Sequence, residues 1–329
     1  MIDTSDFIQL PYTHDLTEGG IAHMLRSLPY NLQREGSSTY ERLRRGVAEA
    51  AVEIAFRRYL SEQGIPFDVK AGLPFTGQDH YDVMLGGRRC EIKSLLIRQD
   101  QQISQIRQNP KLLLKAPVLV ASDQHAAEGH SPRDLYLFAF LLVGSTASQA
   151  DQQKPIAVEQ PHYLIHVLPE AWNRPSQWNP LGKLVLKSEA EDTQTIEIGG
   201  QDEGGALRSC AVELPSRTRI EIQNGFFSLS YVHSKSASPA RLGIHSPVRR
   251  ETYLISATDW GNLWMYNMDI WLAGYITREE FRRRASFIPA GLPVFPYGEM
   301  QVKNLALPVS DLRSLSELLA RLSTAIRTA

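Results

Sequence analysis

The chain has 329 residues, a formal net charge of -1, 43% hydrophobic residues and 22% charged residues. These values indicate a globular protein of one elaborated domain or two packed domains. They exclude a membrane helix, since no segment approaches the roughly 18 uninterrupted apolar residues that such a helix needs. The balanced charge also lacks the basic excess that is usual in proteins that neutralise many phosphates.

Two features bear on where the protein works. The first residues carry acids where a signal peptide has a basic segment, and no apolar stretch follows them, so we expect no export. Cys90 and Cys210 are too few for a disulfide framework or a thiolate zinc site. A cytoplasmic location with both thiols reduced is therefore expected.

The chain opens with residues 1–38, which are rich in turn formers and predict a loosely organised N-terminal lead-in. A helix is expected from 39 to 63, with Thr39 as its cap and Gly64 at its end. Its apolar residues recur near helical spacing: Val47, Ala51, Ile54, Ala55 and Leu60.

The next segment predicts a mixed sheet. A short extended stretch leads to two strands that flank Gly86-Gly87, and a helix after them is broken by Pro110. The apolar run at 116–122 is typical of a buried central strand, and 134–143 predicts another strand. The order of elements over 39–145 therefore predicts an α/β core with a mixed sheet flanked by helices.

Residues 146–250 change in character, with Ser, Thr, Gly and Pro between short alternating runs, and predict a β-rich insertion or second domain. Residues 251–329 regain apolar density and are expected to complete the core with a strand and helices. Thr277 and Glu280 form a capping box for one helix, and Ser310 is the expected cap of the last one.

The Gly86-Gly87 hairpin carries the candidate chemistry. A two-residue turn makes paired residue numbers sum to 173, which places Asp82 opposite Glu91. Because side chains alternate along a strand, these two acids and Lys93 share one face. The opposite face is apolar, with Val83, Leu85, Cys90 and Ile92.

Two like charges directly opposite each other destabilise a sheet unless something offsets the repulsion. A divalent cation would do so, and Mg²⁺ is typically held by one or two carboxylates together with waters and phosphate oxygens. Asp82 and Glu91 are the candidate metal ligands. Lys93 would stand beside the ion, where it could direct a water and stabilise charge on a phosphate. The plainer interpretation is an exposed ion pair of little energetic value.

The hairpin resembles the PD-(D/E)xK superfamily, the restriction-endonuclease-like nucleases, through Asp82, eight intervening residues and Glu91-Ile92-Lys93. The resemblance covers about residues 40–143, and Tyr81 replaces the Pro of the motif. It implies a restriction-endonuclease-like fold and Mg²⁺ or Mn²⁺ as the cofactor.

The resemblance also implies a further acid on the preceding helix and an amide after the motif. Glu53 is favoured narrowly over Glu49 as that acid, although both could be surface charges that pair along the helix. Gln102 or Gln105 resembles the amide position. His80 beside the motif is expected to be exposed.

The functional expectation is a metal-dependent nuclease that hydrolyses phosphodiester bonds, with Glu53, Asp82, Glu91 and Lys93 as its catalytic residues. DNA as substrate, a role in restriction or antiviral defence, and a homodimer or protein partner follow only from the resemblance. Two alternatives stay open. One is a non-catalytic nucleic-acid-binding or assembly module that keeps the fold, and the other is a β-rich ligand-binding protein with an unrelated α/β partner domain. His162 and His166 share a strand face without a third ligand and are expected to have structural or surface roles.

Overall fold

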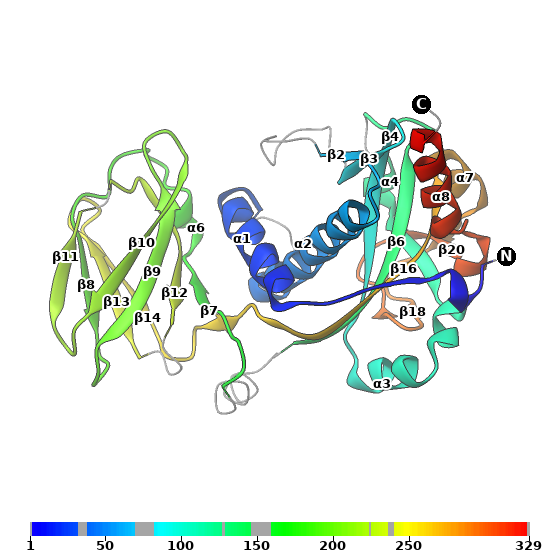
Figure 1. The fold of residues 1–329 in the computed structure, drawn as a ribbon. Helices are drawn as coiled ribbons and strands as arrows, with labels where there is room; N and C mark the ends of the chain where they lie inside the picture. Colours follow the sequence, from blue (N-terminus) through cyan, green and yellow to red (C-terminus); the bar gives the residue numbers. More distant parts are fainter. Residues whose placement is uncertain are drawn as a thin grey trace. The chain divides into compact units, whose positions relative to one another are not determined.

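A computed structural model of the chain describes residues 2–31, 38–69, 82–126, 129–145, 159–223, 225–235 and 240–327. The chain divides into two compact units. Unit 1 comprises Met1–Gly20, Arg45–Ser145 and Met265–Ala329, and unit 2 comprises Ile21–Arg44 and Thr146–Trp264. Helices combine with mixed and antiparallel sheets, so the predicted α/β class is confirmed (Figure 1). Across the described ranges, no helix is both long and apolar enough to cross a membrane.

Unit 1 is built on a six-stranded sheet with the order β1-β16-β6-β4-β3-β2. Strands β4 and β6 run parallel, and every other neighbouring pair is antiparallel. Strand β6 is buried along most of its length because it is apolar on both faces, which is typical of a central strand. The strands are β1 (Ile8–Leu10), β2 (Phe67–Asp68), β3 (Val83–Leu85), β4 (Arg88–Ile97), β6 (Leu135–Ser145) and β16 (Met265–Thr277).

Strands β3 and β4 form the predicted hairpin around Gly86 and Gly87. Val83 pairs with Cys90, so paired residue numbers sum to 173 as expected. Both glycines have positive φ angles, 53° and 72°. A two-residue turn of this hand matches the twist of the flanking strands and admits few residues besides glycine, Asn and Asp. The turn therefore sets the register of the hairpin.

One face of the hairpin is the predicted apolar face. Val83, Leu85 and Cys90 are each at most 2% exposed. Ile92, which shares their face, is half-buried.

The other face of β4 is not a solvated strand face. Glu91 and Lys93 precede Leu95 and Ile97 on it, and these two apolar residues join a core cluster that includes side chains of β6 and α3 (Asp100–Gln108). The charged residues therefore occupy the end of a face that is otherwise apolar and buried.

Helix α2 (Thr39–Glu62) is the helix predicted before the hairpin, and Gly64 follows it with a φ of 64°. Its cap differs from the prediction. The hydroxyl of Ser38, not Thr39, accepts a hydrogen bond from the amide of Glu41 at 3.2 Å. A side chain one residue before the helix reaches this third amide, which makes Ser38 the N-cap.

The predicted lead-in of residues 1–38 contains a helix, α1 (His14–Asn31). Its Gly-Gly pair and Pro29 are turn formers, and they hid the helix in the sequence. The close approach of α1 and α2 explains one of the glycines, since a Cβ atom at Gly20 would lie 2.4 Å from the carbonyl oxygen of Val47.

Strand β5 (Pro117–Ala121) corrects the prediction of a buried central strand. Val118 and Val120 are buried, but β5 pairs with β20 (Asn304–Pro308) in a separate sheet that also contains β17 (Ser286–Ile288). Because β4 pairs directly with β6, there is no position for β5 between them. An apolar run predicts burial but not the pairing partner.

The predicted cap of the first C-terminal helix is confirmed, and that of the last helix is wrong. Thr277 caps α7 (Arg278–Arg284), and its hydroxyl accepts from the amide of Glu280 at 3.2 Å as predicted. Helix α8 (Leu315–Arg327) starts later than predicted, because Ser310 lies in a separate 3-10 turn. The remaining short elements of unit 1 are the 3-10 segments Thr4–Asp6, Pro110–Lys115 and Val309–Asp311, α4 (Ser122–Ala126), β18 (Pro293–Val294) and β19 (Gly298–Glu299).

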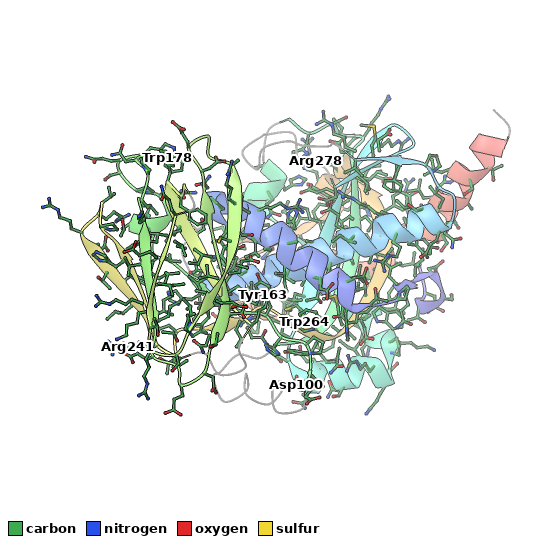
Figure 2. All side chains as sticks on the ribbon, turned by 60° about the vertical axis from the view of Figure 1, so that its left-hand side comes forward. Asp100, Tyr163, Trp178, Arg241, Trp264 and Arg278 are labelled. Carbon is green, nitrogen blue, oxygen red and sulfur yellow. The ribbon has the colours of Figure 1, made fainter. Side chains whose placement is uncertain are left out.

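Unit 2 contains two antiparallel sheets, with the orders β10-β9-β12-β7-β15 and β11-β8-β13-β14, around one shared apolar core. Trp178 and Arg241 lie at opposite ends of this unit in Figure 2. The β-rich part extends beyond the expected boundary at residue 250, because β14 pairs with β13. The elements are β7 (Leu164–Val167), α6 (Glu170–Asn173), β8 (Leu184–Ser188), β9 (Gln194–Gln201), β10 (Leu207–Leu214), β11 (Arg219–Ile222), β12 (Ser228–Ser234), β13 (Leu242–Ser246), β14 (Glu251–Ile255) and β15 (Gly261–Asn262).

Replacing Gly87 with Ala is expected to lower the free energy of unfolding by about 1–2 kcal/mol, the cost of a left-handed conformation for a residue with a Cβ atom. A Cβ atom at this position meets nothing within 4 Å, so the loss is a backbone effect. Gly87→Asn is the matched control and should lose less, because Asn tolerates this conformation. Urea denaturation measures both variants, and equal stability of Gly87→Ala and the wild type would contradict the turn.

Candidate active site

Asp82 lies at the start of β3, one position before the Val83–Cys90 pair. Its amide donates to the carbonyl of Cys90 at 3.1 Å, so Asp82 and Val83 both face Cys90, and the regular register of the hairpin ends at the Val83–Cys90 pair. Its carboxylate Oδ2 accepts a hydrogen bond from the amide of Ile92 at 2.6 Å. These two backbone contacts fix the Asp82 carboxylate beside β4.

The environment of Asp82 disfavours its negative charge. Burial of the carboxylate raises the pKa of Asp82 to about 6, and the charge of Glu91 adds to the rise. The Ile92 amide, Lys93 and Arg57 act in the opposite direction and lower it. A carboxylate in this state is stabilised by a cation or a proton that binds next to it.

Lys93 is held by contacts on several sides. Its Nζ donates to the carboxylate of Glu91 and, at 3.0 Å, to Oε1 of Gln124 in α4. The same ammonium lies 5.6 Å from the centre of the Tyr136 ring. The Lys93 side chain is 11% exposed and that of Glu91 is 27% exposed. Glu91 is therefore the more accessible member of the pair.

A buried arginine supports this arrangement from behind. Arg278, the first residue of α7, is 8% exposed. It donates to the hydroxyl of Tyr136 at 2.7 Å, to the carbonyl of Gln124 at 3.4 Å and to the carbonyl of His125. Nδ1 of His125 also lies 3.1 Å from the Tyr136 hydroxyl. Arg278 thus ties α4 to β6 and holds the residue that contacts Lys93.

The structure connects Glu53 to the site through Arg57. The Arg57 guanidinium forms an ion pair with Glu53 and also donates to the backbone carbonyl of Asp82 at 2.9 Å. The side chain of Glu53 is 22% exposed, whereas Glu49 is an exposed residue. The geometry therefore favours Glu53 over Glu49 as the acid of the helix, with Arg57 between it and Asp82.

The amide side chain that contacts Lys93 is neither of the two that the resemblance implied. Gln102 and Gln105 both lie on α3, and the side chain that contacts Lys93 belongs to Gln124. The only signal in the sequence was a polar segment that directly follows the apolar run of β5. His80 and Tyr81 lie outside the described residues.

Arg278 and Tyr136 were also missed. Arg278 stands inside the predicted capping box, and Tyr136 inside an apolar strand. Neither local pattern distinguishes a residue of the site from a structural one.

Among the described residues, no group of three or more His, Cys, Asp or Glu side chains is arranged to hold a metal ion. Two carboxylates are sufficient for Mg²⁺, whose remaining positions are filled by waters and substrate oxygens. Asp82 and Glu91 provide the oxygen ligands that Mg²⁺ and Mn²⁺ prefer. The raised pKa of Asp82 is consistent with such an ion, because a cation would offset both burial and repulsion. The residues therefore fit the expected cofactor.

Comparison with known proteins found no family model, no curated protein and no solved structure that matches the chain. The site is consequently defined by its own geometry: two acids, one ammonium group and the polar network behind them.

Replacing Asp82 with Asn is expected to stabilise the protein in EDTA at about pH 7.5. The pKa of Asp82 rises on folding from an ordinary 3.8 to about 6. Protonation therefore favours folding, and this contribution is lost as the pH rises through 6. Above that pH, removal of the charge gains on the order of 1–2 kcal/mol for a partly exposed residue. Urea unfolding at about pH 5 and pH 7.5 measures the difference, which should be larger at the higher pH.

The same variant removes the charge of Asp82 without disturbing the hairpin. Asn keeps an oxygen that can accept from the Ile92 amide, so the hairpin should remain intact. Added Mg²⁺ should stabilise the wild type more than Asp82→Asn, because the cation binds the folded state through the carboxylate. A wild type that is more stable than the variant at both pH values in EDTA would contradict the charge penalty.

Replacing Tyr136 with Phe is expected to lower the free energy of unfolding by about 1–3 kcal/mol, because the buried Arg278 guanidinium loses an acceptor. The ring and its packing are unchanged, so the loss of unfolding free energy measures the contribution of the hydroxyl alone. An unchanged midpoint in guanidinium chloride denaturation would show that this hydrogen bond is not part of the stabilising network.

Proposed function

We propose that the chain is a metal-dependent nuclease of the PD-(D/E)xK type that hydrolyses phosphodiester bonds. One observation carries the proposal: the Asp82 carboxylate is bonded to the Ile92 amide, beside the Glu91–Lys93 ion pair, at the end of a buried sheet face. A solvated ion pair would not need the desolvated carboxylate of Asp82 or the enclosed ammonium of Lys93.

Each residue has a separate role in the proposed reaction. Asp82 and Glu91 would hold the cation, which when bound supplies Lewis-acid activation of a water and of the phosphate. Lys93 stabilises negative charge that develops on the phosphate and orients the attacking water by donating to it. Glu53 orients Arg57, whose contact with the Asp82 backbone supports the first ligand.

The residues around Lys93 keep it in a productive position. Gln124 and Glu91 accept from its ammonium, and the face of the Tyr136 ring attracts the same charge. Cys90 does not provide a competing nucleophile. Burial first, and then the charges of Asp82 and Glu91, raise the pKa of its thiol well above the ordinary range.

DNA is the substrate that the resemblance implies, with cleavage by an endonuclease of the restriction or defence type. A homodimer would place two sites on the two strands of a duplex. The competing function is a binding module without catalysis, which would retain the same hairpin but would not need the polar support of Lys93 by Gln124.

The test is cleavage of supercoiled plasmid, single-stranded DNA and RNA in the presence of Mg²⁺, Mn²⁺ or EDTA. The wild type should cut at least one substrate with metal and none with EDTA. Glu91→Gln and Lys93→Met should each lower the rate by at least about 10²-fold, because they remove a metal ligand and a charge-stabilising group.

Lys111→Met and Glu299→Gln are matched controls, since they make the same chemical changes at exposed positions of unit 1. Both should cut as the wild type does. Metal-independent cutting, or cutting that survives in Glu91→Gln and Lys93→Met, would refute the site. Inactivity of every protein on every substrate would favour the binding module.

A further inference from the structure

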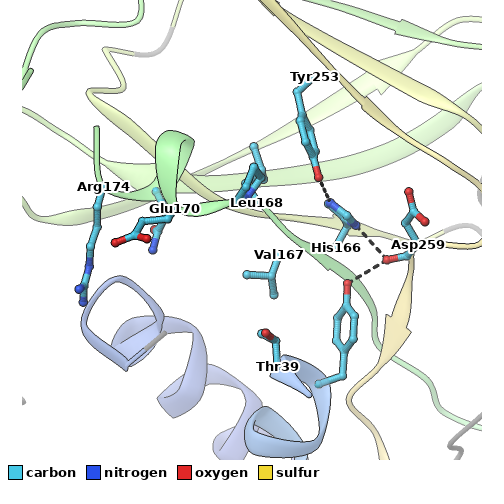
Figure 3. A pocket seen from close by; sticks show the side chains of 11 residues that line it. Thr39, His166, Val167, Leu168, Glu170, Arg174, Tyr253 and Asp259 are labelled. Atoms are coloured by element: carbon cyan, nitrogen blue, oxygen red, sulfur yellow. Dashed lines mark hydrogen bonds between the residues drawn. The ribbon is translucent and has the colours of Figure 1, made fainter. Parts of the chain in front are cut away.

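Unit 2 contains a cavity of about 600 Å³ that is separate from the Asp82–Glu91 site. It is lined by the first turn of α2, the end of β7, α6, Tyr253 of β14 and Asp259, all from the same unit (Figure 3). This volume lies within the range of small-molecule sites in proteins.

One end of the cavity is formed by His166 and the groups bonded to it. The two ring nitrogens of His166 lie 2.9 Å from the carbonyl oxygen of Asp259 and 3.0 Å from the hydroxyl of Tyr253 (Figure 3). The hydroxyl of Tyr40 donates to the same carbonyl at 2.8 Å. Burial lowers the pKa of His166 below its ordinary value, which disfavours the charged form of the ring. His166 is therefore structural, and this end of the cavity is preformed.

The other end of the cavity contains a buried donor without an acceptor. Asn173 lines the cavity and is 0% exposed. Its Oδ1 accepts from the hydroxyl of Ser230 at 2.5 Å, but its Nδ2 has no partner among the described residues. A buried polar group left in this state costs about 1–3 kcal/mol. A ligand oxygen would satisfy it.

Arg174 and the start of α2 lie near this donor, and so does the carboxylate of Glu170 from the same short helix. Arg174 lies beside Asn173 in sequence and lines the cavity, and its Nε donates to the carbonyl of Pro29 at 2.7 Å, which holds the guanidinium in place. Thr39 brings the N-terminal end of the 24-residue helix α2 to the cavity. The guanidinium fork and the helix N-terminus both favour an anion such as phosphate.

The rest of the lining suits an organic ligand that carries hydrogen-bond donors. Tyr253 and Leu168 offer a ring and apolar surface, while the carboxylates of Glu170 and Asp259 can accept hydrogen bonds. Arg174 and Glu170 lie toward one end of the cavity, and Tyr253 and Asp259 toward the other (Figure 3). A ligand with an anionic group and neighbouring hydroxyls at one end and a flat ring with amino groups at the other matches this order, because Arg174 would pair with the anion and Glu170 would accept from the hydroxyls.

We propose that the cavity binds a mononucleotide, with its phosphate at Asn173 and Arg174 and its base toward Tyr253. The proposal is independent of nuclease activity, because none of these residues belongs to the Asp82–Glu91 site.

The experiment is isothermal titration calorimetry of the full chain with AMP, GMP, CMP and UMP, and with adenosine, guanosine, cytidine, uridine and inorganic phosphate alone. All titrations contain EDTA, so that no divalent cation can recruit a nucleotide to the two acids of unit 1. At least one nucleotide should bind with a dissociation constant on the order of 10–100 μM. The corresponding nucleoside and phosphate should each bind at least about tenfold more weakly, because each makes only part of the contacts.

Asn173→Asp replaces the unpaired NH2 with an oxygen of the same shape and keeps an acceptor for Ser230. It should weaken nucleotide binding at least about tenfold, since it removes the donor and places an acid next to the phosphate. Arg174→Met should act in the same direction, and remains informative if the first variant unfolds. Arg208→Met is the matched control, because Arg208 is an exposed residue of β10 that pairs with Asp202. It should bind as the wild type does.

Failure of all four nucleotides to bind would overturn the proposal. So would binding that is equally tight in folded Asn173→Asp or Arg174→Met, because the site would then lie elsewhere. Phosphate alone binding as tightly as the best nucleotide would also overturn it, since the ring would contribute nothing.

Discussion

The two-residue turn at Gly86 and Gly87 sets the register on which the candidate active site depends. This register ends at the Val83–Cys90 pair, and Asp82 directly before it has its carboxylate 2.6 Å from the Ile92 amide and close enough to Glu91 to feel its charge. A shift of one residue would turn the acids to the other face of the sheet, which is occupied by apolar side chains. The parallel pairing of β4 with β6 then fixes what lies beside the acids, because it aligns Glu91 with Tyr136.

The groups around this hairpin act in opposite directions on the ionisation of Asp82. Burial and Glu91 oppose the ionisation of Asp82, while the Ile92 amide, Lys93 and Arg57 support it. The opposing effects prevail, since the pKa of Asp82 rises to about 6. Such a site is less stable than an apolar replacement and binds a cation more readily than an exposed acid pair. This is the balance expected where structure is maintained for chemistry rather than for stability.

The sequence predicted the parts of this site that depend on local geometry. Asp82, Glu91 and Lys93 lie within 12 residues of the chain, so the turn type and the alternation of side chains were enough to place Glu91 and Lys93 on one face and Asp82 near them. Gln124 and Arg278 could not be predicted in the same way. Lys93 and Gln124 are 31 residues apart, and Arg278 reaches the Gln124 carbonyl across 154 residues. Contacts of this kind depend on the pairing of distant strands, and the same limit explains why β5 was assigned to the wrong sheet.

Buried polar atoms without a partner are informative only in combination with their surroundings. The described residues include several, among them the ring nitrogens of Trp260 and Trp271 and Oγ of Ser122. These residues do not line the cavity of unit 2. Asn173 combines an unpaired donor with a cavity and an adjacent guanidinium, while Asp82 combines a disfavoured charge with a second acid and an ammonium group. An isolated unpaired atom is a small stability cost, whereas one that faces a ligand-sized space or a like charge has a specific chemical partner that would relieve it.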